Sequence, residues 1–154
     1  MQALGRHLLL ELFDCDPEAL NNLDFVKEVM VEAAKRAQAT IVDMIFHKFN
    51  PSGISGVVVI AESHLAIHTW PECYYAAVDI FTCGDTLQPQ VAMDYLVGEL
   101  GAARASAVEF QRGVFLHGPH PHKPPPIEDA PVPAEPRPTG APPLAAAAAE
   151  RILG

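Results

Sequence analysis

The feature that most constrains the fold is a succession of short apolar segments between residues 40 and 82. They are rich in residues that favour strands, and turn-forming clusters such as NPSG (50–53) and WPEC (70–73) separate them. Parallel strands need long crossover connections, so segments this closely spaced predict an antiparallel sheet. The predicted strands cover residues 40–48, 56–61, 64–69 and 76–82.

Two segments with helical character flank these strands. Asp24 can cap a helix that runs to Ala37 with apolar residues at helical spacing, and residues 88–100 predict a second helix. Strands at residues 7–13 and 105–111 complete the order β, α, four β, α, β. This order predicts an α+β fold, a two-layer α/β sandwich with a mostly antiparallel sheet and two helices on one face.

The composition of the chain changes near residue 118. Residues 119–143 hold 11 of the 15 prolines, and large apolar residues are almost absent beyond that point. Such a segment cannot build a core. Residues 1–117 are therefore predicted to form one domain, and residues 118–154 a disordered Pro/Ala-rich tail. The stretch LAAAAAERIL near its end could form a helix only with a docking contact to hold it.

The charge of the chain limits its partners. The formal net charge is -9, and residues 1–117 carry 15 of the 19 acids but only 7 of the 10 Lys and Arg residues. Nucleic acid and anionic membranes are therefore unexpected partners, whereas a cationic small molecule suits the chain. Three cysteines without a CxxC pair and an N-terminus unlike a signal peptide or membrane span predict a cytoplasmic protein.

Reactive side chains gather in AESHLAIHTWPE, residues 61–72. A zinc site made of His64, His68 and Cys83 is disfavoured, because side chains four residues apart on a strand stand about 13 Å apart. No metal is therefore expected. A hydrolase triad is disfavoured too, because no GxSxG elbow surrounds Ser63 and His68 lies too close in sequence to reach it in the usual way.

An intramolecular use of Ser63 remains. A serine hydroxyl that attacks the carbonyl of the preceding residue turns an amide into an ester, and a base can then eliminate that ester. The chain is cut, and the serine becomes a pyruvoyl group.

The segments GISGVVVIAESHLAIHTWPE (53–72) and YAAVDIFTCGD (75–85) resemble the S-adenosylmethionine decarboxylase proenzymes of the short prokaryotic type. The resemblance covers about residues 5–113. It implies cleavage between Glu62 and Ser63, and a covalent pyruvoyl cofactor, made from Ser63, that forms a Schiff base with the substrate.

The resemblance also assigns roles to other side chains. Ser55 would support processing by stabilising the developing oxyanion, and His68 would accept the α-proton of the serine during elimination. Cys83 would return a proton to the decarboxylated carbon during turnover. Phe49 and Glu72 match positions that stack the adenine and bind the ribose hydroxyls of the substrate.

The implied reaction converts S-adenosylmethionine to S-adenosylmethioninamine and CO2 for spermidine synthesis. A homodimer or higher homo-oligomer is implied, with active sites at or near the subunit interface. Because Ser52, Cys73 and Tyr74 depart from the family pattern, a related arginine or ornithine decarboxylase is an alternative. An unprocessed, non-catalytic binding or regulatory partner is another, although the intact processing residues count against it.

Overall fold

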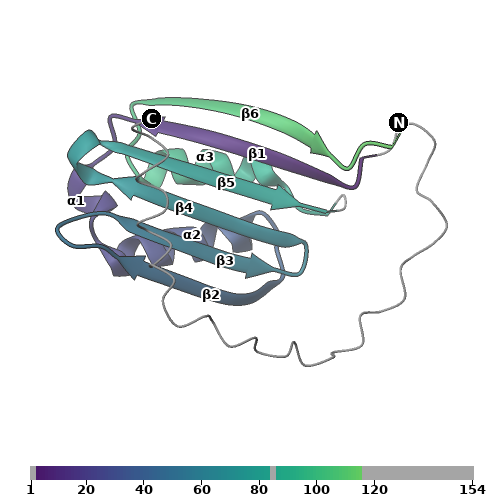
Figure 1. Ribbon diagram of the computed structural model, residues 1–154, viewed down its shortest axis with the longest axis horizontal. Coiled ribbons are helices and arrows are strands. Elements are labelled where there is room, and N and C mark those ends of the chain that lie inside the picture. The colour runs from purple at the N-terminus through teal and green to yellow at the C-terminus, as the bar shows by residue number, and fades with distance from the viewer. Residues whose placement is uncertain (1–2, 84–85, 116–154) are drawn as a thin grey trace, which may run out of the picture. The chain divides into compact units, whose positions relative to one another are not determined.

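Six antiparallel strands form one sheet, and helices pack on one of its faces (Figure 1). The structure is a computed structural model that describes residues 3–83 and 86–115. The strand order is β2-β3-β4-β5-β1-β6. The strands are β1 (Gly5–Phe13), β2 (Ile41–Lys48), β3 (Ile54–Ile60), β4 (Ser63–Trp70), β5 (Tyr75–Thr82) and β6 (Arg104–Arg112). The helices are α1 (Pro17–Leu20), α2 (Leu23–Arg36) and α3 (Pro89–Glu99), and a 3-10 turn, η1 (Pro71–Cys73), joins β4 to β5.

The predicted fold class is confirmed. Every neighbouring pair of strands runs antiparallel, and α2 and α3 lie behind the same face of the sheet (Figure 1). The four-residue helix α1 adds one turn before α2. The predicted tail, residues 118–154, lies outside the described residues.

The start of α2 differs from the prediction. Asn22, not Asp24, caps the helix, and its side-chain oxygen accepts a hydrogen bond from the backbone N–H of Phe25 at 3.2 Å. Asp24 lies in the first turn instead, where its negative charge faces the positive end of the helix dipole. The Asp24 cap is therefore wrong by two residues.

The core lies between the sheet and the two longer helices. Successive strand side chains point to opposite faces, so every second residue of the central strands is buried against the helices. Full burial of one such aliphatic side chain contributes about 1.5–3 kcal/mol. The buried residues include Leu8, Leu10 and Leu12 of β1, Leu65 and Ile67 of β4, Val78 and Ile80 of β5, Val26 and Met30 of α2, and Leu96 of α3.

The opposite face of the sheet carries no helix in the described part of the chain. Large apolar side chains on it are exposed, with Ile45 of β2 at 72%, Val108 of β6 at 54% and Phe110 of β6 at 49%. Strand register places Ser55 opposite His68 and His64 opposite Phe81 on this same face. We call it the open face.

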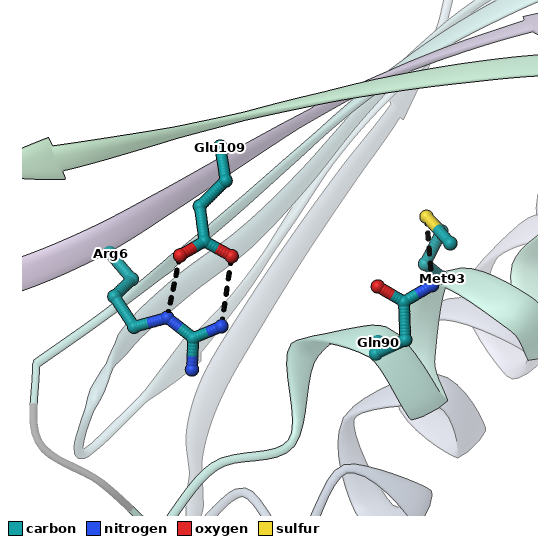
Figure 2. A network of polar contacts seen from close by, with 4 residues as sticks. All are labelled: Arg6, Gln90, Met93 and Glu109. Atoms are coloured by element: carbon teal, nitrogen blue, oxygen red, sulfur yellow. Dashed lines mark hydrogen bonds and ion pairs between the residues drawn. The ribbon is translucent and has the colours of Figure 1, made fainter.

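Strand β6 lies at one edge of the sheet, and an ion pair helps to join it to β1. The Arg6 guanidinium donates to both carboxylate oxygens of Glu109, at 2.9 and 2.8 Å (Figure 2). Both side chains are well exposed, so the pair contributes little stability but favours this strand register.

Candidate active site

Ser55 and His68 form a hydrogen-bonded pair on the open face. They are direct register partners on β3 and β4, and the Ser55 hydroxyl lies 2.7 Å from Nδ1 of His68. The His68 side chain is exposed, and its ring lies 6.2 Å from that of Trp70. This arrangement provides an accessible hydroxyl donor and an accessible base side by side.

Ser63 occupies the first position of β4 in an unusual backbone conformation. Its φ angle is 148°, a region that residues with a side chain rarely adopt. Such conformations cost of order 1–3 kcal/mol and are retained where the surrounding structure enforces them. Here the β3–β4 turn and the pairing of Ser63 with Ile60 and Thr82 hold the residue in place.

The carbonyl that precedes Ser63 is polarised by a backbone donor. The backbone N–H of Cys83 donates to the carbonyl oxygen of Glu62 at 2.8 Å. A donor in this position stabilises negative charge on that oxygen, as an oxyanion hole does. The pairing of β4 with β5 therefore brings Cys83, whose side chain is exposed, beside the Glu62–Ser63 peptide bond.

The Glu62 side chain points to the start of β2. Its carboxylate accepts a hydrogen bond from the backbone N–H of Thr40 at 3.1 Å. Burial alone would raise the pKa of Glu62, but hydrogen bonds from backbone N–H groups and Thr40 outweigh it and lower the pKa. The ionised carboxylate of Glu62 thus links the turn before Ser63 to the residue that precedes β2.

Phe49 and Glu72 lie at the other end of these strands. Phe49 follows β2, is half-exposed, and meets the ring of His47 edge-on at 4.7 Å. Glu72 lies in η1, and its carboxylate accepts a hydrogen bond from the Ser52 hydroxyl at 3.0 Å. The sequence marks Ser52 only as a departure from the family pattern, and its contact with Glu72 follows from the fold.

The predicted site residues thus form two groups within one chain. We call Glu62, Ser63 and Cys83 the cleavage half-site. The base half-site, near the opposite ends of β3 and β4, consists of Ser55, His68, Phe49 and Glu72. Ser63 and His68 are five residues apart on one strand, a separation of roughly 16 Å. The structure pairs Ser55 with His68 and joins Cys83 to the Glu62 carbonyl, whereas Phe49 contacts His47 and Glu72 contacts Ser52. It does not bring the two half-sites together.

Three residues near the cleavage half-site received no role from the sequence. His64 contacts Ser63, with 3.2 Å between Nδ1 and the hydroxyl oxygen, and Phe81 and His7 pack their rings near that of His64. Because His64 follows Ser63 directly in the sequence, a contact between these two side chains could have been predicted. His7 and Phe81 could be placed there only with the strand order known.

In residues 3–83 and 86–115, no group of three or more His, Cys, Asp or Glu side chains could hold a metal ion. Within those same ranges, no helix is long and apolar enough to cross a membrane. Cytoplasmic location stays a prediction.

Comparison with known proteins decides the family. A family model described as S-adenosylmethionine decarboxylase matches residues 6–113. The chain belongs to this family. The matched region contains both half-sites, and the resemblance inferred from the sequence is confirmed.

Individual members of the S-adenosylmethionine decarboxylase family are similar to this chain over about three quarters of its length. The proenzyme of Thermodesulfovibrio yellowstonii is 56% identical over 117 residues, covering 76% of this chain and 87% of that protein. The proenzyme of Clostridium kluyveri is 53% identical over 115 residues, covering 75% and 91%. The crystal structure of the adenosylmethionine decarboxylase from Aquifex aeolicus superposes with a TM-score of 0.71 at 34% identity, covering 78% of this chain and 99% of that one.

Proposed function

We propose that this chain is a self-processing, pyruvoyl-dependent carboxy-lyase that converts S-adenosylmethionine to S-adenosylmethioninamine and CO2 for spermidine synthesis. The observation that carries the proposal is the family match over residues 6–113, which includes an intact Glu62–Ser63 peptide. The strained Ser63 and the backbone donor on the Glu62 carbonyl support it.

Self-cleavage would begin with attack of the Ser63 hydroxyl oxygen on the carbonyl carbon of Glu62. The Cys83 N–H stabilises the oxyanion that forms. Collapse breaks the peptide C–N bond and leaves an ester. His68 of a second copy of the chain, paired there with Ser55, would then take the α-proton of Ser63, and the ester would leave as the Glu62 carboxylate. Hydration and loss of ammonia give a pyruvoyl group at the start of the second chain.

Different residues of the site would then have separate roles in turnover. The pyruvoyl group supplies the electron-accepting carbonyl that ordinary side chains lack. Cys83 lies beside it and would donate the proton that replaces CO2. Phe49 would stack on the adenine ring, and Glu72 would accept hydrogen bonds from the ribose hydroxyls.

The separation of the two half-sites supports a homodimer with shared active sites. His68 cannot reach the α-proton of Ser63 in its own chain across roughly 16 Å. A two-fold pairing of open faces would place the cleavage half-site of one protomer against the base half-site of its partner. It would also cover the exposed apolar side chains of Ile45, Val108 and Phe110.

Ser63→Ala tests the self-processing claim. The variant lacks the attacking hydroxyl, so it should remain a folded single chain without decarboxylase activity. The wild-type protein should give two chains on a denaturing gel, and mass spectrometry should find pyruvoyl at the start of the second. Two chains from Ser63→Ala would contradict the proposal. Release of CO2 from S-adenosylmethionine, arginine and ornithine, measured side by side, identifies the substrate.

A further inference from the structure

The attack by Ser63 requires a proton acceptor, a role that the proposed function leaves unassigned. His68 of the same chain lies roughly 16 Å away along the strand, and the proposed function uses the partner's His68 for a different proton, the one on the α-carbon. In the part of the chain that the structure describes, the side-chain hydrogen bond of Ser63 is with Nδ1 of His64, at 3.2 Å. This contact is local and forms without a partner subunit.

Aromatic rings hold the imidazole of His64 in place. Phe81, its register partner on β5, contacts it edge-on with ring centres 5.9 Å apart, and His7 of β1 lies edge-on at 6.4 Å. Its other register partner, Val59 on β3, cannot ionise. The ring is therefore confined near the Ser63 hydroxyl.

The ionisable groups that act on His7 of β1 come from three other strands: His64 on β4, Asp79 on β5 and Arg112 on β6. Arg112 lies 3.1 Å from Nδ1 of His7. Burial lowers the pKa of His7, Asp79 opposes this effect, and Arg112 and His64 reinforce it. A neutral His7 adds no positive charge beside His64.

We propose that His64 is the base for the first step of self-cleavage. Its neutral ring, protonated on Nε2, accepts the Ser63 hydroxyl proton at Nδ1 while the oxygen bonds to the carbonyl carbon of Glu62. The same proton then passes to the Ser63 nitrogen as the C–N bond breaks. The proton count balances, and no other reactant is needed. This inference rests on the proposed function and assigns the two histidines to successive steps.

The test isolates ester formation from elimination. In a His68→Ala background, elimination is blocked, so the ester accumulates and hydroxylamine cleaves it into two chains that a denaturing gel resolves. Adding His64→Gln or His64→Ala should slow the appearance of hydroxylamine-sensitive chain on the order of a hundredfold to ten-thousandfold. Added imidazole should restore part of the rate in His64→Ala, which a purely structural role for His64 would not allow.

Val59→Thr in the same background is the matched control. It changes a side chain directly opposite His64 without removing a base, so its ester should form at the parent rate. A His64→Gln protein that forms ester as fast as the control would overturn the assignment.

If the wild-type protein itself never cleaves, the proposed function fails. If the wild-type protein cleaves and the His64 variants form the ester as fast as the control, only this inference fails.

Discussion

At the scale of single residues, Cys83 offers the proposed site two different groups. Its backbone N–H donates to the Glu62 carbonyl oxygen at 2.8 Å, whereas its side chain is exposed. In the proposed mechanism, the backbone donor would act on the bond that is cut, and the thiol would protonate the substrate later. A change of the side chain therefore separates the making of the cofactor from its use.

Cys83→Ala keeps the backbone donor, so the variant should still cleave into two chains. Its turnover should fall on the order of a hundredfold to ten-thousandfold, because the decarboxylated carbon has lost its proton donor. Protonation at the pyruvoyl carbon instead would convert that group to alanine. Mass spectra should then show a growing share of second chains that begin with alanine after exposure to substrate. If the cleaved Cys83→Ala protein turned over substrate at the wild-type rate, Cys83 would not be the proton donor.

The phenol of Tyr75, on the open face, is a weaker acid than that of an ordinary tyrosine. Burial raises its pKa to about 12, and its hydrogen bond to Glu11 acts in the same direction. The folded state holds the phenol proton more tightly than the unfolded state. The stability that this group contributes is therefore complete below its ordinary pKa of 10.0 and is lost as pH rises through about 12.

Tyr75→Phe should remove one tyrosine that titrates near pH 12, which an absorbance titration of tyrosinate can follow. The variant should also lose less stability than the parent between pH 10 and 12. Ser63→Ala, an uncut parent, keeps cleavage from complicating the comparison. If the variant and parent titrate alike, the Tyr75 phenol does not carry the shift.

At the scale of elements, strands β2 and β3 are packed very closely at one glycine. Gly56 of β3 lies opposite Phe46 of β2, and the Phe46 ring covers the glycine so closely that an added Cβ would come within 2.0 Å of it. The ring thus occupies the space that a side chain would need. This contact belongs to the strand that carries Ser55.

Gly56→Val should destabilise the fold by about 1–3 kcal/mol, because the Phe46 ring must move. Urea unfolding at fixed protein concentration, in the uncut Ser63→Ala background, measures the change. Gly98→Ala is the control, since nothing lies within 4 Å of its added Cβ in α3. That control should gain about 0.5–1 kcal/mol from helix propensity. Equal stabilities for the two variants would show that the Phe46 contact is not restrictive.

The sequence predicted the elements better than their contacts. Period-two and helical patterns located the strands and the two longer helices because burial imposes those patterns directly. The cap of α2 was misplaced because Asn22 and Asp24 are both good caps, and only backbone geometry chooses between them. The Ser55–His68 pairing depends on the register of β3 against β4, which the turn sets.

At the scale of the whole molecule, the sequence could not reveal that the site residues form two groups. Their motif lies within residues 49–83, which suggests one cluster, but extended chain spreads five residues over roughly 16 Å. The order of residues along one chain does not show which of them would meet across a subunit interface, so the proposed pairing of half-sites needs the strand geometry.

A mixture of two inactive variants tests the shared site. Ser63→Ala lacks the serine, and His68→Ala lacks the elimination base, so neither should cleave alone. When both are expressed together with different tags, the His68→Ala chain should be cut, because its Ser63 meets His68 of the partner. Only that tag should shift on a denaturing gel. Absence of cleavage in purified mixed dimers would contradict site sharing.

The strand order gives the proposed cut a further consequence. Residues 1–62 hold β1, β2 and β3, and residues from 63 onward hold β4, β5 and β6. Because β1 lies between β5 and β6, a strand of the first fragment is bordered on both sides by strands of the second. The fragments would remain interlocked after cleavage. Folding, unimolecular for the intact precursor, would become a second-order reaction for the separated fragments, so maturation would make unfolding hard to reverse in dilute solution.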